Sequence, residues 1–99
     1  MPIQTEEFDP TRYLKTDEAI AAYLQDAVES GDPRVVAACL GDVARAKGMT
    51  DLARETGLSR ESLYRSLSGQ GNPELATLMK VIQAMGLQLR FEPRHSDAA

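Results

Sequence analysis

Polar side chains suited to reading nucleic acid gather between residues 59 and 68 of this 99-residue chain. A helix turns about 100° per residue, so Leu63 and Leu67 on its inner side leave a polar face outward. That face consists of Glu61, Tyr64, Arg65 and Ser68, with Arg60 and Ser62 on its flanks. Arginine pairs with guanine, glutamate accepts from cytosine, and tyrosine or serine reaches phosphates or base edges. The segment therefore predicts a DNA-reading surface.

Two short helices separated by a tight turn must hold this face in place. The sequence predicts helices at 50–56 and 60–68, joined by Gly57-Leu58-Ser59. Gly57 can adopt the left-handed conformation that ends a helix, Leu58 can fill the angle, and Ser59 can cap the next helix. The expected inward residues are Leu52, Ala53, Leu58, Leu63 and Leu67. This pattern is typical of a helix-turn-helix, and an ordinary helical hairpin remains the alternative.

Two longer helices are predicted before this pair. The first begins at Asp17, behind a Thr16 cap, and ends at Ser30-Gly31. Its apolar residues at helical spacing are Ile20, Tyr23, Leu24, Ala27 and Val28. Asp32-Pro33 starts the second, which runs to about Lys47. Its expected inward residues are Val36, Leu40 and Val43, with Cys39 beside them. Gly41 within this helix predicts the close approach of a neighbour.

A final helix and a strand are predicted at the C-terminal end. Asn72-Pro73 starts the helix and Gly86 stops it; the expected inward residues are Leu75, Leu78, Met79, Ile82 and Met85. Leu87, Leu89 and Phe91 then alternate with polar residues, which is the period of a half-buried strand. A lone strand needs a partner, either its copy in a second subunit or the N-terminal arm. These three residues are therefore dimer candidates.

The predicted fold class is all-α, with five helices and a short C-terminal β-strand. The length suits one domain. We expect an extended N-terminal arm at 1–15, the folded domain at 16–92 and a flexible tail at 93–99.

Composition excludes several classes of protein. The chain is 42% hydrophobic and 26% charged, which is ordinary for a globular domain. The single cysteine, Cys39, allows no intramolecular disulfide and no thiolate zinc site, and His95 has no ligand set around it. No catalytic group assembles, so we expect no enzyme, no metal and no cofactor. The sequence shows no signal peptide and no membrane span, which predicts a cytoplasmic protein.

The net charge of −4 is unevenly distributed. Residues 1–32 carry eight acidic and two basic side chains, whereas residues 33–99 carry seven acidic and nine basic side chains. An acidic N-terminal third therefore precedes a mildly basic remainder, which is either a solvated face or a surface for a basic partner.

The segment 48–87, GMTDLARETGLSRESLYRSLSGQGNPELATLMKVIQAMGL, resembles the lambda-repressor-type (Xre) helix-turn-helix family. The shared features are LA, G-[LV]-S, a recognition helix, a G-x-x-N-P turn and a T-L-x-K-V-x-x-A-x-G-L helix. The resemblance implies base reading by Arg60, Glu61, Tyr64 and Arg65. It leaves, as candidates for phosphate contact, Thr50, Ser59, Ser62, Ser68, Gln70 and Asn72. Many relatives carry a phosphate-binding glutamine where this chain has Met49, for which backbone groups near Thr50 can substitute.

With the preceding YL…EAIAAYL…GDP segment, about residues 8–92 resemble HigA-like addiction-module antidotes. The resemblance implies an antitoxin that binds a RelE/ParE-like ribonuclease toxin and represses its own operon as a dimer on a palindromic operator. The acidic arm could cover the toxin's basic surface, anchored by Phe8, Tyr13, Leu14 and Tyr23. Two alternatives stay open: a protein that mainly neutralises a toxin and binds DNA weakly, and a stand-alone transcription regulator without a toxin.

Overall fold

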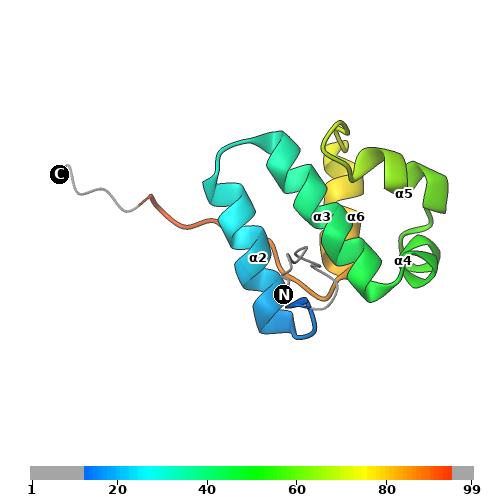
Figure 1. Cartoon of the computed structure of the whole chain (residues 1–99), viewed down its shortest axis with the longest axis horizontal. Coiled ribbons are helices and arrows are strands. Elements are labelled where there is room, and N and C mark those ends of the chain that lie inside the picture. Colours follow the sequence, from blue (N-terminus) through cyan, green and yellow to red (C-terminus); the bar gives the residue numbers. More distant parts are fainter. Residues whose placement is uncertain (1–12, 95–99) are drawn as a thin grey trace, which may run out of the picture.

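The computed structural model describes residues 13–94 and contains five helices in that range. They are α2 (Asp17–Glu29), α3 (Pro33–Lys47), α4 (Met49–Thr56), α5 (Arg60–Ser66) and α6 (Leu75–Ala84). Helix α3 lies between α2 on one side and the α4–α5 pair on the other, and α6 packs against α4 (Figure 1). The all-α prediction is therefore confirmed for the described residues. Most of the predicted arm and tail lies outside them.

The first two helices begin where the sequence predicts. Thr16 caps α2 by accepting a hydrogen bond from the Ala19 backbone N–H at 3.0 Å. Asp32 caps α3 by accepting from the Arg34 backbone N–H at 2.9 Å, and Pro33 takes the first helical position. The Arg34 side chain also bonds Asp32, and these bonds hold the pKa of that carboxyl below its usual range.

Side chains of α3, α4, α5 and α6 form most of the core. Its most deeply buried large side chains are Leu40, Val43, Leu63, Val81 and Met85. The inward prediction is confirmed for Leu40, Val43, Leu52, Leu63 and Leu67. On α2, Ile20 and Ala27 are buried and Tyr23 and Leu24 are half-buried, whereas Val28 is 56% exposed. The apolar stripe predicted for α2 therefore includes one residue too many, Val28.

Helix α3 approaches the end of α5 at Gly41. A Cβ atom placed on Gly41 would lie 2.2 Å from the Leu67 carbonyl oxygen, which is far inside van der Waals contact. The predicted close approach is confirmed, although the neighbour is the residue that follows α5 rather than the helix itself. Only a glycine permits this spacing.

A polar contact joins α2 to α3. The Tyr23 hydroxyl donates to the Asp42 carboxylate at 2.6 Å, and Asp42 also pairs with Arg45 one turn further along α3. Burial and the bond to Asp42 both raise the pKa of Tyr23 above its ordinary value. The phenol therefore stays protonated and serves as a donor between the two helices.

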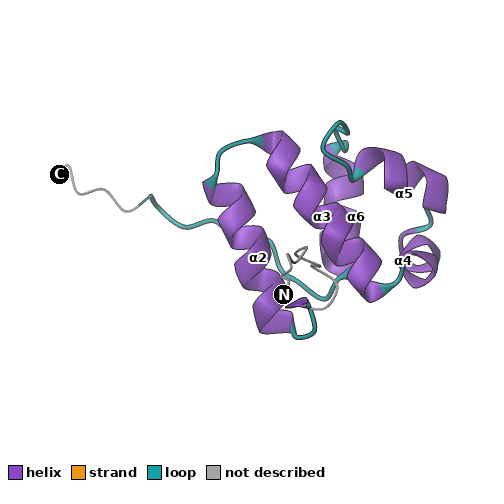
Figure 2. Ribbon diagram, in the orientation of Figure 1, coloured by secondary structure: helices purple, strands orange, loops and turns teal. Residues whose placement is uncertain are grey.

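The predicted C-terminal strand is absent from the described residues. The chain after α6 is a loop through Arg94 (Figure 2). Leu87 is half-buried and its N–H donates to the Ile82 carbonyl at 3.1 Å, but Leu89 is exposed and Phe91 is 89% exposed. A strand is held by ladder bonds to a second strand, and residues 13–94 provide none. The alternation of apolar and polar residues was therefore not sufficient to predict a strand.

Helix α6 differs from its prediction in start and in orientation. It begins at Leu75 rather than at Asn72-Pro73, because Pro73 and the extended Glu74 precede it. Val81 and Met85 are buried and Leu78 and Ile82 are half-buried, whereas Leu75 is 68% and Met79 is 55% exposed. With seven apolar residues in ten positions, the helical period did not specify which side faces inward. Helix α5 also ends at Ser66 rather than at residue 68.

Gly41→Ala is expected to lower the free energy of unfolding by about 1–3 kcal/mol, because the new methyl group meets the Leu67 carbonyl. The loss should appear despite the higher helix propensity of alanine. Gly69→Ala is the control, since the nearest atom to its Cβ would be 4.0 Å away. Urea unfolding of both variants measures the difference. Equal stability of the two variants would contradict the close contact.

Tyr23→Phe is expected to reduce stability by about 1 kcal/mol through loss of the bond to Asp42. Folding raises the pKa of Tyr23. The stabilisation that its hydroxyl provides is therefore fully present below the pKa of the unfolded chain, about 10, and is lost as the pH rises further. Urea unfolding at pH 7, 9 and 11 should show the two proteins converging only at the highest pH. A constant difference would refute the donor role of Tyr23.

Candidate nucleic-acid interface

Helices α4 and α5 are joined by a turn that the sequence describes correctly. Gly57 has a φ of 77°, in the left-handed region, and its N–H donates to the Ala53 carbonyl at 2.9 Å. Ser59 is extended and accepts from the Ser62 backbone N–H at 3.0 Å, so it caps α5. The hydroxyl of Ser59 is therefore engaged within the protein.

Thr56 is a second organiser of this turn that the sequence analysis missed. Its buried hydroxyl donates to the Leu52 carbonyl at 2.8 Å and accepts from the Leu58 backbone N–H at 3.2 Å. The contact ties the last turn of α4 to Leu58, which packs against the core. A threonine that donates a hydrogen bond to a carbonyl of the preceding turn has no distinctive sequence pattern, so the sequence did not indicate this role of Thr56.

The outer face of α5 is polar and exposed. Leu63 is fully buried, whereas Arg60, Glu61, Tyr64 and Arg65 are all exposed, as the sequence predicts. The guanidinium carbon of Arg60 lies 6.0 Å from the centre of the Tyr64 ring, a spacing at which a cation is attracted to the ring face. The helix therefore presents two arginines, one carboxylate and one phenol to solvent.

The loop after α5 uses part of its polar capacity internally. Ser68 donates to the Arg65 carbonyl and accepts from the Gln70 backbone N–H, both at 3.3 Å. A Cβ atom on Gly71 would lie 2.2 Å from the Ser66 carbonyl, so the loop folds tightly against the end of α5. Gln70 and Asn72 are exposed, whereas Ser62 and Ser68 are half-buried. Gln70 and Asn72 thus have the more accessible polar groups.

The start of α4 lacks a side-chain cap. Met49 is buried in the core, and Thr50 beside it is exposed. The first backbone N–H groups of a helix have no intrahelical partner and attract anions. Asp51 carries negative charge there, but it pairs with Arg54 at 2.5 Å.

A second, acidic surface lies on α2. This helix contains no basic residue, and its four exposed acidic side chains are Asp17, Glu18, Asp26 and Glu29. The ring of Tyr13, which is exposed, lies 6.3 Å from that of Tyr23. Leu14 is buried in the core, so its side chain supports the fold at this point. Phe8 lies outside the described residues.

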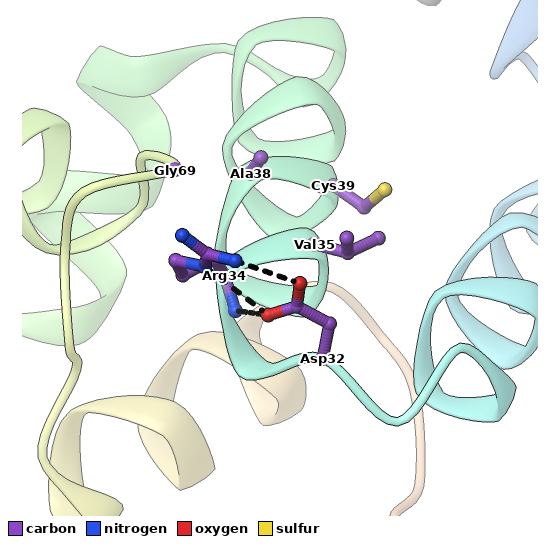
Figure 3. Close-up of a pocket in the computed structure, with 6 residues that line it drawn as sticks. All are labelled: Asp32, Arg34, Val35, Ala38, Cys39 and Gly69. Carbon is purple, nitrogen blue, oxygen red and sulfur yellow. Dashed lines mark hydrogen bonds and ion pairs between the residues drawn. The ribbon is translucent and has the colours of Figure 1, made fainter.

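A shallow hollow of about 390 Å³ opens between the start of α3 and the loop after α5. Figure 3 shows Asp32 and Arg34 paired with one another at its edge, beside Val35, Ala38, Cys39 and Gly69. The Asp32 and Arg34 side chains are thus engaged with one another. Residues 13–94 contain no group of three side chains that could hold a metal ion. None of the helices in this range is long and apolar enough to cross a membrane.

Comparison with known proteins agrees with an antidote role. Residues 4–93 match the family model described as "Probable addiction module antidote protein". An uncharacterized protein of Haemophilus influenzae is 41% identical over 92 residues, which cover 93% of this chain and 95% of the relative. No solved structure matches the chain. Because the family model matches nearly the whole chain, the chain belongs to the family of probable addiction module antidote proteins, which indicates an antitoxin role.

Proposed function

We propose that this protein is the antitoxin of a type II module that binds a RelE/ParE-like toxin and represses its own operon by reading DNA with α5. The observation that carries the DNA-binding part is the polar face of α5, which the core holds outward through Leu63. The observation that supports toxin binding is the acidic surface of α2. The helices that carry these two surfaces, α2 and α5, lie on opposite sides of α3 (Figure 1).

In the proposed complex with DNA, α5 enters the major groove and acts as the recognition helix of a helix-turn-helix. Arg65 and Arg60 supply bidentate donors for guanine, and Glu61 accepts from cytosine. Tyr64 lies against Arg60, and that contact limits the orientations of the guanidinium. Backbone groups at Thr50 and the exposed Gln70 and Asn72 hold phosphates.

The charge of the α4–α5 pair supports a modest affinity for DNA. Its two helices contain three arginines and three acidic residues, so they have no net positive charge. Phosphate neutralisation supplies much of the affinity of DNA-binding proteins. A single copy should therefore bind weakly, and two copies on a palindromic operator should bind far better. Toxin neutralisation is the stronger activity of one copy in this account.

The proposed toxin contact depends on charge complementarity. A ribonuclease binds a polyanion and therefore carries a basic surface, which the exposed carboxylates of Glu18, Asp26 and Glu29 on one face of α2 can approach favourably. The paired rings of Tyr13 and Tyr23 at this end of the molecule add apolar contact area. Phe8 belongs to the same proposed contact and precedes the described residues.

Arg65→Ala is expected to weaken binding to the DNA upstream of the gene by at least about tenfold, since a bidentate base contact is worth about 1–3 kcal/mol. Binding to unrelated DNA should change little. Arg54→Ala removes another exposed arginine, which is already paired with Asp51, and it serves as the control. Fluorescence anisotropy at fixed salt measures both. Retention of full sequence preference by Arg65→Ala would refute base reading by α5.

The double variant Asp26→Lys/Glu29→Lys is expected to bind the toxin encoded beside the gene about tenfold more weakly or worse. Lysines at the C-terminal end of α2 favour the helix dipole, so the fold should be retained. Glu55→Lys/Glu92→Lys changes the charge equally on exposed residues outside α2. Calorimetric titration compares the two variants. If both lose the same affinity, net charge rather than the α2 face governs binding. A neighbouring gene that encodes no small basic protein would instead favour the stand-alone regulator.

A further inference from the structure

The segment after α6 has the side-chain pattern of a strand but not the hydrogen bonds of one. Apolar residues alternate with polar residues from 87 to 91, and the structure forms no strand at this alternating segment. Among the described residues, no hydrogen bond involves the backbone of residues 88–91. All four of these residues are exposed, so their N–H and C=O groups are accessible to a partner.

Both ends of the alternating segment are defined. Gly86 has a φ of 80° and turns the chain out of α6, and the Leu87 N–H donates to the Ile82 carbonyl at 3.1 Å. Leu87 also packs against the core, so the segment starts from a fixed point on the domain. Pro93, beyond the other end, has no N–H and cannot donate to a strand ladder. The segment therefore has the length of a short strand.

The side chains of the alternating segment divide into an apolar and a polar set. Leu89 is 49% and Phe91 is 89% exposed, and in a strand they point to the same side. Gln88 and Arg90 then point to the opposite side. A single strand is not stable in water, because its bonds and its apolar face need neighbours. The segment is thus suited to become a strand when it meets the edge of a sheet in another protein.

We propose that residues 87–91 bind the toxin by adding a strand to an open edge of its β-sheet, an inference that rests on the proposed toxin binding. In this mode of recognition, main-chain hydrogen bonds supply affinity, and pockets for alternate side chains supply specificity. Leu89 and Phe91 fill those pockets, and Leu87 holds the new strand to the antitoxin core.

The position of the alternating segment favours the toxin over DNA and over a second copy. From the end of α6 the chain runs to the α2 side of the molecule, away from α5 (Figure 1). It therefore extends away from the proposed DNA-reading face. A second copy bound to this segment would bring two acidic α2 helices toward one another, whereas a basic toxin is attracted by the same helix.

The two toxin contacts then differ in physical nature. The carboxylates of α2 attract the toxin over a distance, so their loss should mainly slow association and should matter less at high salt. The added strand acts only at contact distance, through apolar burial and backbone hydrogen bonds. Loss of its side chains should therefore mainly speed dissociation, at low and at high salt alike.

The double variant Leu89→Ser/Phe91→Ser tests the apolar contact. Biolayer interferometry with the toxin encoded beside the gene should show at least about tenfold faster dissociation. Leu75→Ser/Met79→Ser is the matched control, because it removes two apolar side chains that are 68% and 55% exposed on α6. Helix content from circular dichroism checks that both variants fold. Unchanged dissociation of Leu89→Ser/Phe91→Ser, or an equal change in the control, would overturn the proposal.

Amide hydrogen exchange of the wild-type complex with the toxin tests the strand itself. Only every second N–H of an added strand bonds to its neighbour, so slower exchange is expected either at 88 and 90 or at 89 and 91. Toxin binding without slower exchange at 88–91, or with slower exchange at all four amides, would reject the added strand and retain the proposed function. Slow exchange of alternate amides without toxin would assign the edge to a second copy and overturn the toxin as occupant. A wild-type protein that does not bind the toxin would reject the toxin-binding function and this inference with it.

Discussion

The contact between Gly41 and the Leu67 carbonyl is the constraint on which the rest of the molecule depends. It allows α3 to lie against the end of α5 at a distance that no side chain would permit. With Leu63 and Leu67 buried behind it, α5 can present only its polar side to solvent. The exposure of Arg60 and Arg65 is therefore a consequence of packing in the interior and not of the surface sequence alone.

Helix α3 connects the two charged surfaces as well as supporting them. On one side it is bonded to α2 through Tyr23 and Asp42, and on the other it contacts α4 and α5. The net charge of −4 is thus the sum over surfaces of different charge that suit different partners. An acidic α2 suits a basic toxin, and the arginines of α5 suit DNA. This division explains how an acidic chain of an antidote family can carry a surface that we propose binds DNA.

Local chemistry made much of the fold predictable. Thr16, Asp32 and Ser59 cap helices, and Gly57 takes the left-handed conformation, because each of these roles depends on a residue and its immediate neighbours. Two features that depend on distant contacts were predicted wrongly. The C-terminal alternation forms no strand in the described chain, since no second strand lies beside it. The orientation of α6 was set by packing against α4, which its almost uniformly apolar sequence could not reveal. The outward residues of α5 were found because Leu63 and Leu67 fix its inner side, whereas the Thr56 contact has no distinctive sequence pattern.

The most direct measurement of the central claim is an NMR titration of the labelled protein with the DNA duplex upstream of its gene. We expect the largest amide shift changes on residues 60–65 and on the loop around Gln70, with small changes along α2. Because α2 lies on the opposite side of α3, its amides should show large shift changes only with the toxin. Changes centred on α2, or none on α5 at saturating DNA, would contradict the assignment of α5 as the reading helix.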